Sequence, residues 1–187
     1  MKKFNCLIAT IAFIGLLLVG CSDKSQSPIA PTDEQGSLEK VTTINYTATI
    51  TIVGLVDPGS VKIVGQNMIV KDRVVLTRYE SSSPLVTGDL LITINFRYNL
   101  NTGEGPSHGK WSNVPDAFPD AVWEGSFTGY RTKTGESEWT ENVYIVGKGE
   151  GGVIDGMKNF ADGLIYSTHI YEETGFVGEG SGVLKSK

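Results

Sequence analysis

The chain is short of cysteine, with two in 187 residues, Cys6 and Cys21. Residues 22–187 can therefore form no disulfide, no thiolate-ligated zinc site and no thiol nucleophile. Positive charge is also scarce, since 16 Lys and Arg stand against 21 Asp and Glu and the net charge is −5. A net acidic chain lacks the broad basic surface that nucleic-acid binding needs, so we predict no nucleic-acid partner.

Histidine is equally scarce, because His108 and His169 are the only two. A zinc site usually needs three or four protein ligands, so both histidines are expected at the surface. The carboxylates are expected on solvated strand faces and in loops; they group as Glu136, Glu138 and Glu141, as Glu172 and Glu173, and as Asp116 and Asp120. We assign no catalytic residue, no metal ligand and no cofactor. The Gly-x-Gly-x-x-Gly spacing of 147–152 lacks the crossover helix of a nucleotide site and is predicted to be a bend between strands.

No segment longer than about ten residues has helical periodicity, whereas period-two alternation is widespread. The clearest strand is 90–98, in which Leu90, Ile92, Ile94, Phe96 and Tyr98 share one face. The other predicted strands cover 44–52, 60–80 with a break near 65–67, 110–114, 121–130, 138–148, 164–172 and 176–184. Residues 99–108 are predicted to form a long turn, 132–136 a hairpin turn, and 155–160 one turn of helix.

Many short strands with short connections predict an all-β fold, an antiparallel barrel or a sandwich. The chain has 23 glycines, and several recur inside the late strands, for example Gly125, Gly129 and Gly147. Glycine within a strand marks sharp bends or close backbone approach, which a small barrel needs in order to close. We therefore predict an antiparallel barrel of about eight strands with an apolar lumen over 41–187.

The one long apolar run lies at the start of the chain, from Leu7 to Val19, after the basic Lys2 and Lys3. A basic end, a short apolar segment and small residues at its close are typical of a secretory signal peptide. Leu18-Val19-Gly20-Cys21 resembles the lipobox of bacterial lipoproteins. The resemblance implies that 1–20 is removed and that Cys21 is lipidated as the new first residue. An ordinary secretory signal or a single transmembrane helix remains an alternative.

Residues 22–40 are polar and include Pro28 and Pro31, a composition that predicts a flexible tether after the lipidated Cys21. The lipoprotein resemblance implies an exported protein of the bacterial cell envelope whose partner is the membrane, held through Cys21. Ser22 follows the cysteine, which resembles the outer-membrane rather than the inner-membrane sorting signal of Gram-negative lipoproteins.

Residues 73–184 resemble bacterial proteins of the allene oxide cyclase-like barrel, which are related in architecture to plant dirigent proteins. The resemblance is carried by 81–88 (SSSPLVTG), 122–129 (VWEGSFTG) and 147–157 (GKGEGGVIDGM). It implies an eight-stranded barrel with an apolar lumen. No catalytic residue of those families matches a position here, so none is carried over.

Aromatic side chains are the candidate lining of a lumen that holds a ligand: Phe96, Tyr98, Trp123, Phe127, Tyr144 and Tyr166. Tyr and Trp combine an apolar body with a polar tip and are common in binding pockets. The leading hypothesis is therefore a module that binds a small apolar molecule. Three alternatives stay open: rings that merely fill the barrel, a cyclase or isomerase that acts by shape, and an adhesive envelope protein that uses its outer face. Protein partners cannot be predicted from the sequence.

Overall fold

The computed structural model describes residues 41–136, 138–167 and 176–186. The predicted signal peptide, Cys21 and the tether lie outside these residues, as do His169, Glu172 and Glu173. The described residues belong to one compact unit, Leu38–Lys187. Within them, no helix is both long and apolar enough to cross a membrane.

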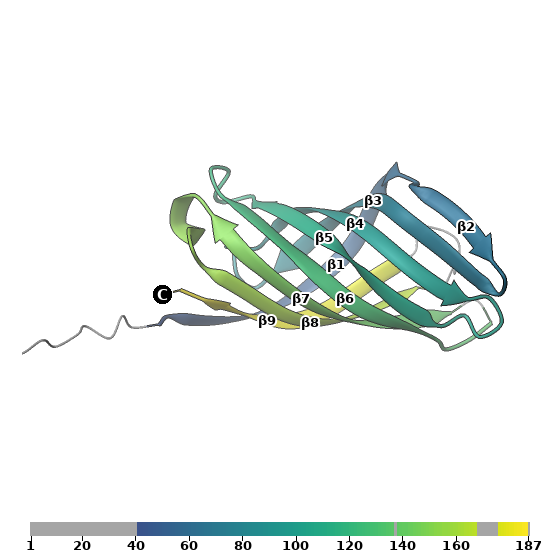
Figure 1. Cartoon of the computed structure of the whole chain (residues 1–187). Coiled ribbons are helices and arrows are strands. Elements are labelled where there is room, and N and C mark those ends of the chain that lie inside the picture. The colour runs from purple at the N-terminus through teal and green to yellow at the C-terminus, as the bar shows by residue number, and fades with distance from the viewer. Residues whose placement is uncertain (1–40, 137, 168–175, 187) are drawn as a thin grey trace, which may run out of the picture. The chain divides into compact units, whose positions relative to one another are not determined.

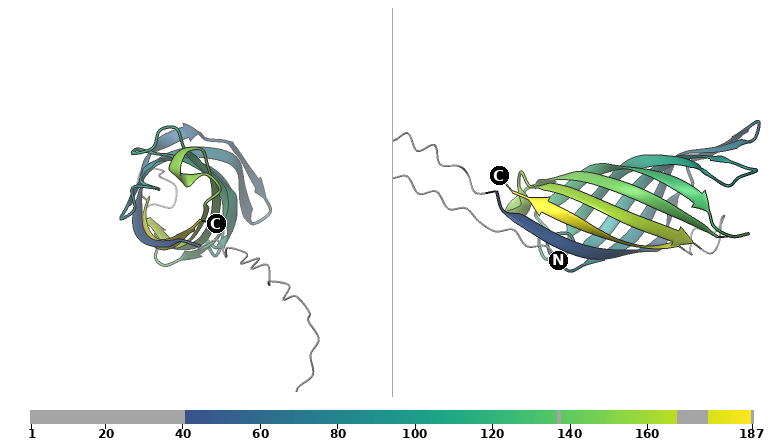
Figure 2. Two further views of the ribbon diagram at one scale, coloured as in Figure 1. Left: turned by 90° about the vertical axis from the view of Figure 1, so that its left-hand side faces the viewer. Right: turned by 90° about the horizontal axis from the view of Figure 1, so that it is seen from below.

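The protein is all-β, and its strands form one antiparallel sheet that closes into a barrel (Figures 1 and 2). The strands are β1 Thr43–Asp57, β2 Ser60–Val64, β3 Asn67–Ser81, β4 Gly88–Asn99, β5 Gly105–Pro115, β6 Val122–Lys133, β7 Trp139–Glu150, β8 Lys158–Ser167 and β9 Phe176–Lys185. The sheet order is β1-β9-β8-β7-β6-β5-β4-β3-β2, and pairing of β1 with β3 closes a ring of eight strands. The predicted fold class is confirmed.

Period-two alternation divides each strand between the lumen and the outer surface. In β1, Tyr46 and Ala48 are buried, whereas Thr47 and Thr49 between them are exposed. In β4, Leu90, Ile92, Phe96 and Tyr98 are buried, as the alternation predicted. Apolar residues on the inner face of every ring strand therefore form the interior of the barrel.

Three predicted elements differ from the structure. Strand β5 begins at Gly105, so His108 is not in a turn but on the exposed face of a strand. The inner face of that part of β5 carries Ser107 and Gly109, which give no apolar signal. The helical turn predicted at 155–160 is found earlier, as the 3₁₀ segment η1, Gly152–Ile154. Residues 158–160 belong to β8. Strand β8 runs over Lys158–Ser167 and so starts six residues earlier than the predicted 164–172.

One end of the barrel is packed with apolar side chains, and we call it the packed end. Trp123, Ile154 and Leu184 are each 0% exposed there, and η1 brings Ile154 into the core. Full burial of such a side chain contributes about 1.5–3 kcal/mol. Thr43 pairs with Lys185 at this end, so the barrel begins and finishes on the packed side.

At the opposite end, β2 lies outside the ring and forms a two-stranded ribbon with Asn67–Lys71 of β3 (Figure 2). Residues Asn67–Val70 of β3 also stay paired with β4. All five residues of β2 are exposed. A register shift in the pairing of β3 with β4 falls between Val70 and Arg73, and Asp72 there has a φ of 56°. A bulge of this kind bends a strand, and β3 pairs with β4 on both sides of it. Exposed apolar side chains of this region include Val53, Leu55, Val56, Val61, Ile63 and Val64.

Candidate functional site

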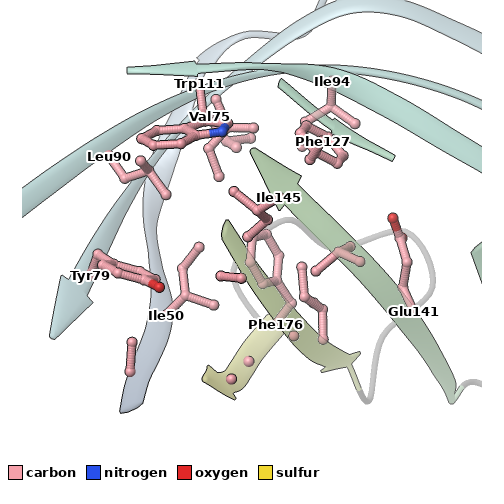
Figure 3. A pocket seen from close by; sticks show the side chains of 18 of the residues that line it. Ile50, Val75, Tyr79, Leu90, Ile94, Trp111, Phe127, Glu141, Ile145 and Phe176 are labelled. Atoms are coloured by element: carbon pink, nitrogen blue, oxygen red, sulfur yellow. The ribbon is translucent and has the colours of Figure 1, made fainter. Parts of the chain in front are cut away.

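The barrel contains a partly open cavity of about 160 Å³ in its lumen. All eight ring strands contribute to its wall. Trp111, Phe127 and Ile145 face it from three of those strands (Figure 3). The lumen is therefore not packed solid: rings and aliphatic side chains fill its ends, and a space remains between them.

Inward-facing glycines make room for the large rings of the wall. A β-carbon placed on Gly125 would lie 2.7 Å from the Trp111 ring, and one on Gly147 would lie 2.5 Å from it. Contacts that short are not tolerated, so the Trp111 ring can lie flat across β6 and β7 only over glycine. The recurring glycines of the late strands thus set the shape of the lumen as well as the bending of the sheet.

The end opposite the packed end carries a buried ion pair on the inner face of the barrel, and we call it the polar end. Arg131 of β6 lies directly opposite Glu141 of β7, and Nη2 of Arg131 is 3.4 Å from Oε2 of Glu141. Their side chains are only 10% and 8% exposed. Ser107 donates a hydrogen bond from its hydroxyl to the other carboxylate oxygen of Glu141. Burial lowers the pKa of Arg131, while the nearby Tyr98 and Glu141 act in the opposite direction.

Aromatic rings surround the Arg131 guanidinium. Its central carbon lies 3.4 Å from the centroid of the Trp139 ring and 4.1 Å from that of Tyr98. Tyr98 is stacked on Phe96 with the centroids 4.2 Å apart. Burial raises the pKa of Tyr98. Cation–π contacts are stronger where water is excluded, so these rings stabilise the buried cation.

Several buried polar atoms of this interior have no hydrogen-bond partner among the described residues: Arg131 Nε, Trp139 Nε1, Tyr98 Oη and Asn113 Oδ1. The tryptophans elsewhere in the barrel differ, because Trp123 Nε1 donates to the Leu85 carbonyl at 2.7 Å and Trp111 Nε1 to the Ser126 carbonyl at 3.3 Å. Three of the four atoms belong to the cluster around Arg131, whereas Asn113 lies opposite Trp123 toward the packed end. Buried polar groups are normally paired, so the cluster around Arg131 stands out.

The structure separates the six aromatic residues predicted to line the lumen. Phe96, Trp123 and Phe127 line the cavity, and Tyr98 is buried behind Phe96 without reaching the cavity wall. Tyr144 and Tyr166 are 48% and 40% exposed on the outer face, so their predicted inward placement was wrong. Apolar and polar residues do not alternate strictly around either tyrosine. Because a shift of one residue exchanges the two faces of a strand, the sequence did not fix which face each tyrosine joins.

Sequence reasoning missed the most informative polar residues of the site. Glu141 was expected in a solvated cluster, yet it is 6% exposed and lines the cavity with Arg131 and Trp139. A usable signal was the phase of β6, where Arg131 lies four residues after Phe127 and therefore on the same inner face. In contrast, Glu136 and Glu138 are exposed, as expected.

The site offers hydrogen-bond donors, one carboxylate and an apolar wall. Within the described part of the chain, no group of three or more His, Cys, Asp or Glu side chains is placed to hold a metal ion. The glycines at 147–152 lead into η1, which spans three residues. The chemistry that this arrangement supports is the enclosure of a small molecule with hydrogen bonding at the polar end.

Comparison of the chain with protein-family models, with curated proteins and with solved structures finds no match.

Proposed function

We propose that the protein binds a small, largely apolar molecule in the barrel lumen. The observation that carries the proposal is the cavity of about 160 Å³ in the lumen with Ile, Val, Phe and Trp side chains on its wall. Apolar cavities of about 150 Å³ are large enough to hold a benzene-sized molecule. The expected ligand is therefore on the scale of a single ring with short substituents.

The energetic cost of an empty cavity supports this proposal. The side chains of the chain itself leave this apolar wall uncovered, and covering apolar surface is favourable. Larger side chains at Ala161 or Ala48, both on the cavity wall, would fill part of it. A chain that keeps small residues there gives up stability, and a bound ligand would restore much of it.

The proposed setting is the bacterial cell envelope, with the barrel anchored to a membrane through lipidated Cys21. Its support is the basic, apolar and Leu-Val-Gly-Cys pattern of residues 1–21. Labelling of growing cells with an alkyne fatty acid tests it: the wild-type chain should carry the label and Cys21→Ala should not. Equal labelling of the two would overturn the anchor proposal. The kinship with allene oxide cyclase-like barrels stays a prediction based on the sequence pattern.

Two of the alternatives retain specific support. A cyclase or isomerase is favoured by the buried Glu141 carboxylate on the cavity wall, since it is a group able to accept a proton. An adhesive role is favoured by the exposed apolar side chains of β2 and the end of β1. A buried polar side chain in the lumen would favour an enzyme: Tyr98 is buried, whereas Arg97 and Tyr144 are exposed on the outer face.

Native mass spectrometry of the full chain, purified without denaturation, tests the binding proposal. A reproducible added mass that is lost on denaturation would support a lumen ligand, and its identity would separate carrier from isomerase. A clean mass that stays unchanged after incubation with an extract of envelope lipids would overturn the proposal and favour the adhesive alternative.

A further inference from the structure

We propose that the lumen ligand carries an uncharged carbonyl oxygen, which accepts hydrogen bonds from Arg131 Nε and Trp139 Nε1. This inference rests on the proposed function and names the chemical class of its ligand. Both residues line the cavity, and they are only 9% and 6% exposed. Neither atom has an acceptor among the described residues.

The two groups can only donate. A guanidinium nitrogen and an indole nitrogen each carry hydrogen and have no available lone pair. They also belong to adjacent groups, since the Arg131 guanidinium carbon is 3.4 Å from the Trp139 ring centroid. Tyr98 Oη, a third buried group without a partner in the described part of the chain, belongs to the same cluster. One oxygen acceptor at this point would satisfy neighbouring donors together, whereas an apolar ligand would leave them unpaired.

The charges at the polar end favour a neutral acceptor over a carboxylate. Glu141 already balances Arg131 at 3.4 Å, so an anionic ligand would place a second negative charge beside a buried carboxylate. Arg73 also lines the cavity as a second cation, 5.6 Å from the Phe96 ring centroid, and its Nε donates to the Pro58 carbonyl at 3.3 Å. A charged probe therefore has to be compared directly with a neutral one. A ketone, aldehyde, ester or amide oxygen brings acceptor capacity without charge.

A matched series of small probes tests the acceptor. Acetophenone has a ring and a carbonyl group and suits the size of the cavity. In α-methylstyrene a CH₂ group replaces the carbonyl oxygen with nearly the same shape, and benzoate adds a negative charge. We expect calorimetric titration of the full chain to give a Kd for acetophenone about tenfold lower than for either of the others, as for one or two net hydrogen bonds.

The possible outcomes separate the two levels of the proposal. If acetophenone and α-methylstyrene bind equally, the lumen is an apolar site and the acceptor inference is overturned while the binding function stands. If benzoate binds most tightly, the neutral acceptor is wrong. If none of the three binds, the proposed function fails together with the inference.

Substitution at the donors gives a second, independent test. Trp139→Phe keeps a ring against Arg131 but removes the indole N–H, so the preference for acetophenone over α-methylstyrene should fall about threefold to tenfold. Arg131→Lys keeps the positive charge facing Glu141 and removes Nε, so the preference for acetophenone should fall by the same factor. This variant replaces Trp139→Phe in the test if Trp139→Phe does not fold. The control is Tyr144→Phe, which removes a hydroxyl from the outer face and should leave the preference unchanged. A preference that persists in both donor variants would overturn the inference.

Discussion

The tryptophan and tyrosine side chains at the two ends of the barrel differ in how their polar atoms are paired, although Asn113 Oδ1, opposite Trp123, also has no partner among the described residues. At the packed end, Trp123 donates to a carbonyl at 2.7 Å, and Tyr46 donates to Asn159 Oδ1 at 2.7 Å. At the polar end, Trp139 Nε1 and Tyr98 Oη have no partner among the described residues. The aromatic content of the lumen therefore does not by itself define its function, whereas the unpaired donors mark the polar end as the place for a ligand group.

The ends also differ in buried charge. The packed end is formed by apolar side chains around Ile154 and Leu184, while the polar end holds the Arg131–Glu141 pair on the inner face. Taking two charges out of water costs several kcal/mol per ion before their attraction and hydrogen bonds are counted. Because of this cost, the buried ion pair adds little net stability. We infer that it instead holds the side chains around the cavity in place.

The largest expected effect comes from removing one partner of that pair. Glu141→Leu leaves Arg131 as a buried cation without its counter-ion and should lower the free energy of unfolding by about 3–5 kcal/mol. The double variant Arg131→Met with Glu141→Leu should recover most of that loss, because apolar side chains of similar volume replace both charges. Urea unfolding at neutral pH measures both. A loss below about 1 kcal/mol in the single variant would mean that water reaches Arg131 and that the polar end is not a dry site.

The two tryptophans offer a direct exchange between the ends. Trp123→Phe removes a paired N–H, leaves the Leu85 carbonyl without its donor and opens a void at a fully buried site. It should cost about 2–3 kcal/mol. Trp139→Phe removes an unpaired N–H, so the relief of that group offsets lost packing and the cost should stay below about 1 kcal/mol. Equal losses in urea unfolding would show that pairing does not distinguish the ends.

The sequence predicted the barrel and the inner faces of β1 and β4 because those faces are apolar at strict period two. It failed for the first half of β5, whose inner positions Gly105, Ser107 and Gly109 are small or polar. In β7 the residues Val143, Tyr144 and Ile145 are all apolar or aromatic, so alternation does not fix which face each one joins.

The candidate site was harder to predict than the fold. Charged residues are almost always placed outside on statistical grounds, and so Glu141 was assigned to solvent. The phase of Phe127 puts Arg131 on the inner face. The hairpin expected at 132–136 would place residue 131 opposite residue 137, whereas the structure pairs Arg131 with Glu141. These local observations therefore put Arg131 inside but do not give its partner. What they cannot supply is the pairing of individual atoms, because that depends on side-chain packing across strands far apart in the chain.

At alkaline pH, a buried tyrosine at each end should lower the stability of the barrel. Burial is the largest cause that raises the pKa of Tyr46 at the packed end and of Tyr98 at the polar end. Because each folded-state pKa lies above the unfolded value of about 10, stability is unaffected below pH 10 and falls as the pH rises through the folded value. Between its unfolded and its folded pKa, a buried tyrosine lowers stability by up to about 1.4 kcal/mol per pH unit.

The phenylalanine variants test this at both ends. Between pH 10 and 11, Tyr98→Phe should reduce the alkaline loss of stability by about 1 kcal/mol, and Tyr46→Phe should change it in the same direction. At pH 7 the two should differ, since Tyr46→Phe breaks the bond to Asn159 and costs about 1 kcal/mol, whereas Tyr98→Phe is neutral or stabilising. Urea unfolding at pH 7, 10 and 11 measures all of these values. A destabilising Tyr98→Phe at pH 7 would mean that its hydroxyl is paired.

The smallest effect is expected in the ribbon beyond the ring, where β2 pairs only with β3. Ile63 is 64% exposed, so Ile63→Thr should change the free energy of unfolding by no more than about 0.5 kcal/mol and leave probe binding in the lumen unaltered. Analytical ultracentrifugation of the same variant addresses the adhesive alternative, because exposed apolar strands are sites of association. If the wild-type chain self-associates and Ile63→Thr does not, the ribbon has an interaction role that is separate from the cavity. If both remain monomeric, the differences between the two ends of the lumen are the better guide to function.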